Sequence, residues 1–363
     1  MKIKTNKKEL LNQLQVVQNI ISPKATLPIL SNILIETKNN DLRFTSTDLD
    51  IGITCLLPVD INEQGAITLP ARRFIEIIRE LPDNEIRITT RKNNTTLIET
   101  DNCQFKLSGL PKEEFPKLPE LKDKQVFKIE QAELKQMINL TSFAVSHDES
   151  RFVLSGILFN IKNNKITTVA TDGRRLAVYT KSTETNIAKE INSVVPLKAI
   201  MEINKNLTDE GDVSIVFGSN QALFEFKNKT IVTRLIEGEF PDYNQVIPRE
   251  NDGKIKIDRE EFLSALKRAA LLNTPDFQAV KLTLSKNKLV VSKTTPDVGE
   301  SWEELKTITA SKDLIIGFNP VYLVDVLKNL TDVEVEIELT EPEKPAVIRS
   351  NGYVYVVLPM RLT

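Results

Sequence analysis

Apolar and polar residues alternate along most of this chain, and stretches with helical spacing interrupt the alternation. Runs such as "LRFTSTDLDIGIT" at 42–54 predict strands that bury one face. Asparagine pairs at 39–40 and 163–164 break such runs where tight turns are expected. The segment 69–81, "LPARRFIEIIREL", instead places its apolar residues at the spacing of an amphipathic helix. The pattern therefore predicts an α+β protein with short helices among many strands.

Two phrases each occur three times, at intervals of about 125 residues. The first predicts a strand that leads into a helix, and reads "IKTNKKEL" at 3–10, "FKIEQAEL" at 127–134 and "IKIDREEF" at 255–262. The second predicts a helix with proline near its start, and reads "LPARRFIEIIREL" at 69–81, "VPLKAIMEINKNL" at 195–207 and "FNPVYLVDVLKNL" at 318–330. Because alternating stretches follow each phrase, the sequence predicts six copies of one β-α-β-β-β module.

The repeats divide the chain into three similar domains of two modules each. Proline-rich, polar segments at 110–124 and 237–252 lie at matching places between the repeats and are typical of linkers. We therefore expect domains at 1–122, 123–248 and 249–363.

Composition limits the kinds of chemistry this chain can do. With one histidine, His147, and two cysteines, Cys55 and Cys103, it has no Cys/His cluster with metal-ligand spacing and no disulfide framework, and we expect no metal or cofactor. Lysine and arginine number 48 against 50 acidic residues, a net charge of −2, so a nucleic-acid surface would have to gather positive charge on one face. No apolar stretch suits a membrane span or a signal peptide, which favours a cytoplasmic protein without a membrane partner.

Several phrases identify a family. The threefold array, "LPIL" at 27–30, "ATDGRRLA" at 170–177, "FPDY" at 240–243 and the closing "VYVVLPMRL" at 354–362 resemble the bacterial sliding clamps, the beta subunits of DNA polymerase III. The resemblance covers the whole chain. It implies a DNA-clamp fold and a head-to-tail homodimer, closed into a ring with sheets outside and helices inside.

The resemblance also implies what the protein does and what it meets. It implies a non-catalytic processivity factor that encircles double-stranded DNA without reading its sequence. The implied protein partners are a second copy of the chain, the replicative DNA polymerase subunit, a clamp-loader ATPase, and other polymerases and repair proteins that carry short clamp-binding peptides. No P-loop occurs in the sequence, so the energy that opens the ring must come from another protein.

By the same resemblance, a peptide-binding pocket lies between the second and third domains. Matched residue by residue, the pocket comprises Leu154, Thr171, Gly173, Arg174, Arg175, Leu176, Pro241, Val246, Val356, Leu358, Pro359, Met360 and Arg361. Its apolar members suit Leu or Phe side chains, and its arginines suit the polar groups of an extended peptide. Gln245 stands where some members of the family have arginine.

Basic residues lie off the apolar faces of the expected helices. The helical pattern places there Arg72, Arg73, Arg79, Lys135, Lys198, Lys205, Lys267 and Arg268, and the resemblance adds Lys24, Arg151 and Phe152 as residues that meet DNA. Such contacts to phosphate read no sequence and weaken with salt. Ordinary solvated helix faces are the alternative reading of each of these positions.

The resemblance also implies the ring interface. Phe105 of one chain packs near Leu271 and Leu272 of the other, and Arg73 faces acidic residues. These acidic candidates are Glu300, Glu303 and Glu304. Packing inside the core of one chain is the alternative for the three apolar residues.

Two other functions are open from the sequence. "DLDIG" at 48–52 resembles the D-x-D start of the haloacid-dehalogenase phosphohydrolases, but the alternating strand before it differs from the buried parallel strand that such a motif ends. Thr47-Asp48 and Thr171-Asp172 also occupy equivalent places in the repeat, which favours a shared strand-end turn. The second alternative is a repeat scaffold that encircles no DNA.

Overall fold

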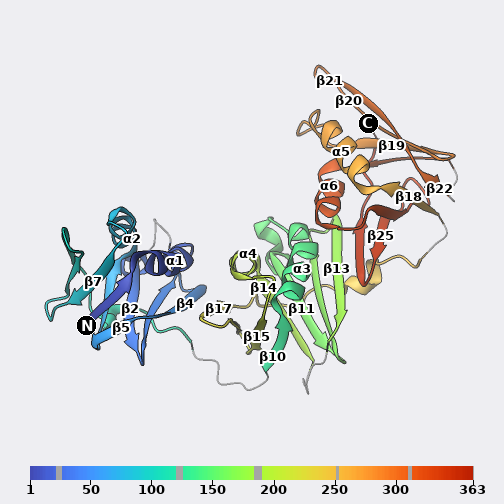
Figure 1. Cartoon of the computed structure of the whole chain (residues 1–363). Helices are drawn as coiled ribbons and strands as arrows, with labels where there is room; N and C mark the ends of the chain where they lie inside the picture. The colour runs from blue at the N-terminus through green and yellow to red at the C-terminus, as the bar shows by residue number, and fades with distance from the viewer. Residues whose placement is uncertain (22–26, 120–125, 184–189, 251–252, 310–312, 363) are drawn as a thin grey trace. The chain divides into compact units, whose positions relative to one another are not determined.

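The computed structural model describes residues 1–21, 27–119, 126–183, 190–250, 253–309 and 313–362 (Figure 1). Within these residues the helices are α1 (Lys7–Gln18), α2 (Ala71–Glu80), α3 (Gln131–Thr141), α4 (Leu197–Asn206), α5 (Arg259–Ala270) and α6 (Pro320–Asn329). Each begins at the end of a strand, as the two repeated phrases predict.

Side chains at the strand ends start several of these helices. The amides of Lys8 and Glu261 donate to the side chains of Asn6 and Asp258, which cap α1 and α5. Pro70 is the N-cap of α2, and Pro320 is the first residue of α6, where a missing N–H costs nothing. The expected role of proline is thus confirmed at both helices.

The strands fall into a repeated order along the chain. The first third has β1 (Lys2–Asn6), β2 (Asn32–Lys38), β3 (Asp41–Thr47), β4 (Ile51–Pro58), β5 (Asp60–Glu63), β6 (Ala66–Pro70), β7 (Glu85–Thr90), β8 (Thr95–Glu99) and β9 (Gln104–Ser108). The second has β10 (Val126–Glu130), β11 (Gly156–Lys162), β12 (Lys165–Thr171), β13 (Arg175–Ser182), β14 (Ile191–Pro196), β15 (Asp212–Phe217), β16 (Gln221–Glu225) and β17 (Lys229–Arg234). The last has β18 (Lys254–Asp258), β19 (Val280–Ser285), β20 (Lys288–Thr295), β21 (Gly299–Lys306), β22 (Ile308–Thr309), β23 (Leu314–Phe318), β24 (Glu334–Glu338), β25 (Ala346–Ser350) and β26 (Tyr353–Val357). The six β-α-β-β-β modules are present, and β5 and β22 are short additions to them.

The two modules of each third exchange their first strands. The first-module strands β2, β3 and β4 share a sheet with β6 of the second module, which pairs with β2. Likewise β7, β8 and β9 share a sheet with β1 of the first module, which pairs with β7. The same exchange joins β10 to β15 and β14 to β11, and later β18 to β24 and β23 to β19. The exchange therefore links the sheets of the two modules through their first strands.

The sheets also continue from one repeat into the next. β4, the last strand of the first module, pairs antiparallel with β17 at the end of the fourth. β13, at the end of the third module, pairs in the same way with β26 at the end of the sixth. The last strands of the second and fifth modules, β9 and β21, are edge strands of their sheets in the described chain.

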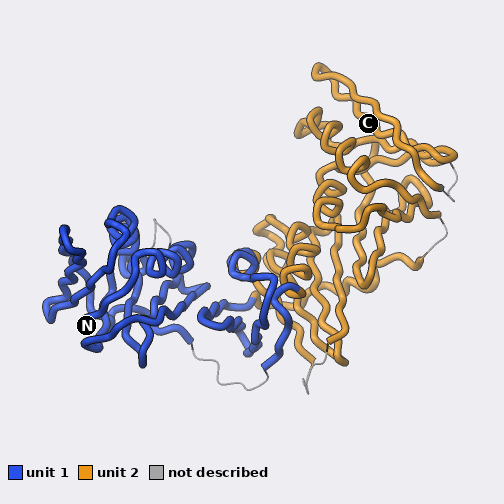
Figure 2. Tube along the Cα trace, viewed as in Figure 1, with its two compact units in different colours: residues 1–132, 201–235 blue, residues 133–200, 236–363 orange. Residues whose placement is uncertain are grey.

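The described residues form two compact units (Figure 2). Unit 1 comprises 1–132 and 201–235, and holds the five-stranded and eight-stranded sheets. Unit 2 comprises 133–200 and 236–363, and holds the nine-stranded and four-stranded sheets. Within unit 1, α1 and α2 lie side by side, as α5 and α6 do within unit 2 (Figure 1).

Each unit has its own buried core. Phe44 and Phe74 are fully buried in unit 1, and Phe159, Phe262 and Phe318 in unit 2. The Cys55 thiol is buried, and burial raises its pKa to about 12, so that the group stays protonated near neutral pH. Cys103 is partly exposed and lies 3.0 Å from the hydroxyl of Thr100.

Candidate functional site

The turn at 171–175 is a hydrogen-bonded scaffold between β12 and β13. The Thr171 hydroxyl donates to the Arg175 carbonyl at 2.6 Å and accepts the Gly173 amide at 3.1 Å. One oxygen of Asp172 accepts the amides of Arg174 and Arg175 at 2.9 and 3.0 Å. Gly173 has φ +83°, and a Cβ there would collide with the guanidinium of Arg151. Glycine favours this backbone and leaves room for the Arg151 guanidinium, although Leu49 adopts φ +80° at the equivalent place in the first turn.

The same turn occurs between β3 and β4. The Thr47 hydroxyl donates to the Ile51 carbonyl at 2.8 Å and accepts the Leu49 amide at 3.0 Å. Asp48 accepts the amides of Asp50 and Ile51 at 3.0 and 2.8 Å. The prediction that the Thr-Asp step is a shared strand-end turn is confirmed. Among the described residues, no group of three or more His, Cys, Asp or Glu side chains could hold a metal ion near Asp48 or elsewhere.

Arg175 differs from its counterpart in the first turn because its guanidinium is bound on all sides. Its nitrogens donate to Asp172 at 3.0 Å, to Asp325 of α6 at 2.8 Å and to the Phe143 carbonyl at 2.6 Å. The guanidinium carbon lies 4.4 Å from the ring centre of Tyr322, and the side chain is only 9% exposed. Arg175 therefore fastens the turn to α6, and its nitrogens are not available to a peptide in this structure. Arg174 is exposed.

Two of the expected apolar pocket residues belong to one buried cluster. Leu176 of β13 and Val356 of β26 lie opposite each other in the sheet and are each 4% exposed. They pack with Leu158 and Val347, and the partly buried Phe240 covers the group. The paired strands thus bring residues from distant parts of the chain to one apolar surface.

The segment after β17 lies over this surface. Tyr243 and Ile247 pack against the cluster, whereas Val246 is 58% exposed. Val246 and Ile247 line a cavity of about 290 Å³ together with Thr340, Lys344 and Pro345 from the β24–β25 connection. An exposed valine at the mouth of a cavity is a natural place for an apolar side chain of a ligand to bind.

The residues after β26 are held at two points. The Leu358 amide donates to the Arg174 carbonyl at 2.9 Å, and the Met360 amide donates to the Gly317 carbonyl of β23 at 2.8 Å. A Cβ at Gly317 would lie 2.6 Å from the Met360 carbonyl oxygen, so glycine allows the close approach. Leu358 is 44% exposed, and Pro359 and Met360 are partly exposed. These residues therefore form a fixed, accessible apolar border.

Gln245 changes the electrostatics at the mouth of the cavity. Its amide donates to Asp242 at 3.0 Å. This bond, with those from Asn244, lowers the pKa of Asp242 below its ordinary value, so the carboxylate stays ionised. With glutamine in place of arginine, the acidic charge of Asp242 is not neutralised from position 245.

The remaining pocket positions are placed as follows. Thr171 and Leu154 are partly exposed, and Gly173, Pro241 and Arg361 are exposed. All thirteen expected residues lie in unit 2. The structure adds Tyr322, Asp325 and Phe143 as supports, and Thr340, Lys344 and Pro345 as lining. Asp325, the one acid in the repeated phrase at 318–330, was the one signal for these residues in the sequence.

The expected DNA-facing residues lie on α2, α3, α4 and α5 and in the 149–154 turn, with Lys24 outside the described residues. The exposed ones are Arg72, Arg73, Arg79, Arg151, Phe152, Lys198, Lys205, Lys267 and Arg268, and Lys135 is partly exposed. Several of them pair with neighbouring acids: Arg72 and Arg73 with Glu76, Lys205 with Glu202, and Arg268 with Glu303. Arg151 also donates to the Asp172 carbonyl at 2.7 Å. The exposed pairs of Arg72 and Arg73 within α2 are of a weak kind, so these two cations stay available to phosphate, whereas Arg268 is joined to Glu303 of β21.

The expected interface residues lie near the two edge strands. Phe105 on β9 is 39% exposed, and Leu271, directly after α5, is 81% exposed, which disfavours core packing for Leu271. Leu272 is partly buried, and its carbonyl accepts the Thr295 hydroxyl at 2.7 Å. Of the acids on β21, Glu303 pairs with Arg268 and Glu304 with Lys288, which leaves Glu300 without an ion pair to any described residue.

Comparison with known proteins decides the family. Three models of the DNA polymerase III beta subunit match this chain: the N-terminal domain at residues 1–119, the central domain at 128–242 and the C-terminal domain at 244–361. The chain belongs to the DNA polymerase III beta subunit family. The beta sliding clamp of Chlamydia muridarum is 33% identical over 363 residues, which cover 100% of this chain and 99% of that protein.

Solved clamp structures share the whole fold. The sliding clamp of Bacillus subtilis has a TM-score of 0.96 and 31% identity, and covers 100% of both chains. A Pseudomonas aeruginosa clamp bound to griselimycin has a TM-score of 0.95 and 32% identity, again over 100% of both chains. This member of the family is thus a DNA sliding clamp with the three-domain clamp fold, and not an enzyme; nothing supports the phosphohydrolase alternative.

Members of the family bind DNA, a second copy of themselves, the polymerase and clamp-binding peptides. The sequence expectation for these classes of partner is confirmed at the level of the family. No helix in the described part of the clamp is long and apolar enough to cross a membrane.

Proposed function

We propose that this clamp closes into a head-to-tail ring by joining the edge strand β21 of one chain to β9 of a second. The supporting observation is the order of strand pairing. The first module of one repeat joins the second module of the next repeat at β4–β17 and again at β13–β26. Continuing that order, β21 of the third repeat meets β9 of the first repeat of another chain. Two such junctions close a ring, and no sheet edge of this kind is left open.

Within the ring, the helices with their exposed basic residues face the DNA and the sheets face outward. Arg79, Lys198 and Lys267 are among the exposed cations that would lie along the phosphates. Repeat domains at 1–122, 123–248 and 249–363 would then give six per ring. A clamp-loader ATPase opens the ring, and the protein works in the cytoplasm with polymerases and repair proteins.

Retention on circular DNA tests this proposal. Protein incubated with nicked circular DNA, ATP and a bacterial clamp-loader complex is expected to co-elute with the DNA in gel filtration, and to be lost once the circle is cut. Retention that survives linearisation would indicate simple electrostatic binding, and no retention on either form would favour a scaffold without DNA. The control for non-specific binding repeats the whole procedure with linear DNA in place of the circle.

The pocket in unit 2 is the docking site for partner peptides. Its support is the convergence of the buried Leu176–Val356 surface with the exposed Val246 and the fixed Met360. An extended peptide would place Leu or Phe side chains on this surface. Arg174 would reach its polar groups, while Arg175 holds the turn in position.

Replacing Met360 with alanine is expected to weaken binding of griselimycin by about tenfold, because a partly exposed thioether that a ligand would cover is lost. Isothermal titration measures the affinity, and sedimentation velocity is expected to show an unchanged dimer. Met201→Ala, which alters a 46% exposed methionine on α4, is the matched control. Equal affinities in both variants would remove Met360 from the pocket.

A further inference from the structure

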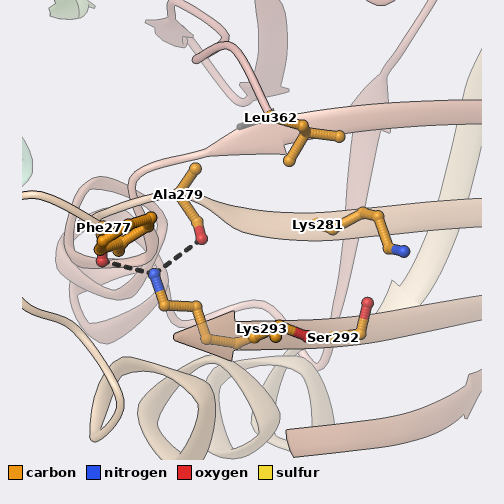
Figure 3. A pocket seen from close by; sticks show the side chains of 7 residues that line it. Phe277, Ala279, Lys281, Ser292, Lys293 and Leu362 are labelled. Carbon is orange, nitrogen blue, oxygen red and sulfur yellow. Dashed lines mark hydrogen bonds between the residues drawn. The ribbon is translucent and has the colours of Figure 1, made fainter. Parts of the chain in front are cut away.

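A second cavity lies in unit 2, on the four-stranded sheet β21-β20-β19-β23 (Figure 3). Its volume is about 270 Å³, enough for a small molecule only. Lys281 and Thr294 come from β19 and β20, and Leu362 from the end of the chain. None of these is a residue of the peptide pocket, so this cavity is a separate feature of the clamp.

Two cations and no carboxylate are among the described residues that line the cavity. Lys293 is only 3% exposed, and its ammonium donates to the carbonyls of Phe277 and Ala279 at 2.6 and 2.9 Å (Figure 3). Burial lowers the pKa of Lys293 below its ordinary value. Lys281 is exposed and forms no ion pair with any described residue. Buried charge of one sign, held only by carbonyl dipoles, makes the site attractive to an anion.

A hydrogen-bonding group also stands unused in the cavity. Ser292 lies opposite Lys281 in the β19–β20 ladder. Its hydroxyl oxygen is buried and has no hydrogen-bond partner among the described residues. In Figure 3 the Ser292 hydroxyl and the Lys281 ammonium lie at the end of the cavity away from the Lys293 ammonium. An unsatisfied buried hydroxyl is uncommon and often marks a place where a ligand binds.

We propose that this cavity binds a small carboxylate with a short apolar tail. One carboxylate oxygen accepts from the Lys281 ammonium and the other from the Ser292 hydroxyl. The tail lies against Phe277 and Leu362, and Lys293 adds its charge while holding the 277–279 segment in place. The ammonium of Lys281 and the hydroxyl of Ser292 are two separate donor groups, one for each carboxylate oxygen. Glu300, opposite Thr294 on the neighbouring strand, limits the negative charge the site accepts.

Methyl NMR of leucine-labelled protein tests the proposal, with hexanoate as the probe and the Leu362 methyl groups as the reporter. Hexanoate is expected to shift the Leu362 signal in a saturable way, and hexan-1-ol, which lacks the charge, is expected not to. Lys281→Gln and Ser292→Ala are each expected to weaken hexanoate binding by about tenfold, the typical effect of a hydrogen bond to a charged group. Lys288→Gln, at a lysine of the neighbouring strand β20 that is paired with Glu304, is the matched control and is expected to bind like the parent.

A second probe distinguishes a free small carboxylate from the carboxyl end of a protein chain. Acetyl-Gly-Leu with a free carboxyl end is compared with the same peptide ending in an amide. If only the free acid binds, the carboxyl end of a protein chain fits the site; if hexanoate binds and neither peptide does, the ligand is a free small carboxylate. Either result supports the carboxylate site. No saturable shift with any probe, equal shifts with hexan-1-ol, or unchanged binding in both Lys281→Gln and Ser292→Ala would overturn it.

Discussion

Leu271→Asp is expected to leave the clamp folded but monomeric, and to abolish its retention on circular DNA. Leu271 is 81% exposed in the single chain, so its replacement removes no core contact. In the proposed ring it lies at the junction with Phe105 of the second chain, where a carboxylate would be buried without a partner. That costs about 3 kcal/mol at each junction, or roughly a hundredfold in affinity. A closed ring contains two such junctions. The two hundredfold effects multiply, so the dimer-to-monomer equilibrium shifts by about ten-thousandfold.

Sedimentation velocity and negative-stain electron microscopy measure this effect. The parent is expected to give six-lobed rings with an open centre, and Leu271→Asp to give single chains. Val333→Asp is the matched control, because Val333 is 77% exposed and stands directly before β24, which belongs to a different sheet from β21. If Leu271→Asp stays dimeric at concentrations where Val333→Asp does, the proposed junction is misplaced.

Much of this architecture could be predicted because it depends on neighbours along the chain. Helix starts at Asn6 and Pro320, and the Thr-Asp turns at 47 and 171, need only local side chains and backbone amides. The recurrence of these patterns along the chain then supported the interpretation of each one. The expected modules and turns are therefore confirmed.

Pairings between distant residues could not be predicted in the same way. Alternation at β1 and β7 does not say that these strands pair, because periodicity reports which face is buried and not which strand lies alongside. The same limit hid the cavity beside Lys293, whose acceptors are carbonyls with no sequence signature. At the pocket, the resemblance placed Arg175 among peptide-contacting residues. Its fixed orientation depends in part on Asp325 of α6, which is 150 residues away along the chain.

Arg175→Met is expected to destabilise unit 2 by about 3 kcal/mol, the lower part of the range for breaking a buried ion pair. Methionine keeps most of the side-chain stem but leaves Asp172 and Asp325 without their cation, and these carboxylates are only 17% and 25% exposed. The stacking on Tyr322 is lost as well. Differential scanning calorimetry should show the transition of unit 2 at lower temperature, and griselimycin binding should weaken because the turn is no longer fastened to α6.

Two further variants separate this cause from a general effect of losing an arginine. Arg174→Met makes the same change one residue earlier at an exposed side chain, and should alter stability by less than about 0.5 kcal/mol. The double variant Arg175→Met/Asp325→Leu also removes one of the two carboxylates left without a cation. It should recover part of the lost stability without restoring ligand affinity. Recovery of both would mean that Arg175 acts only through stability. Equal melting of Arg175→Met and Arg174→Met would show that the guanidinium network contributes nothing, and the fixed turn would then depend on the Thr171 and Asp172 hydrogen bonds alone.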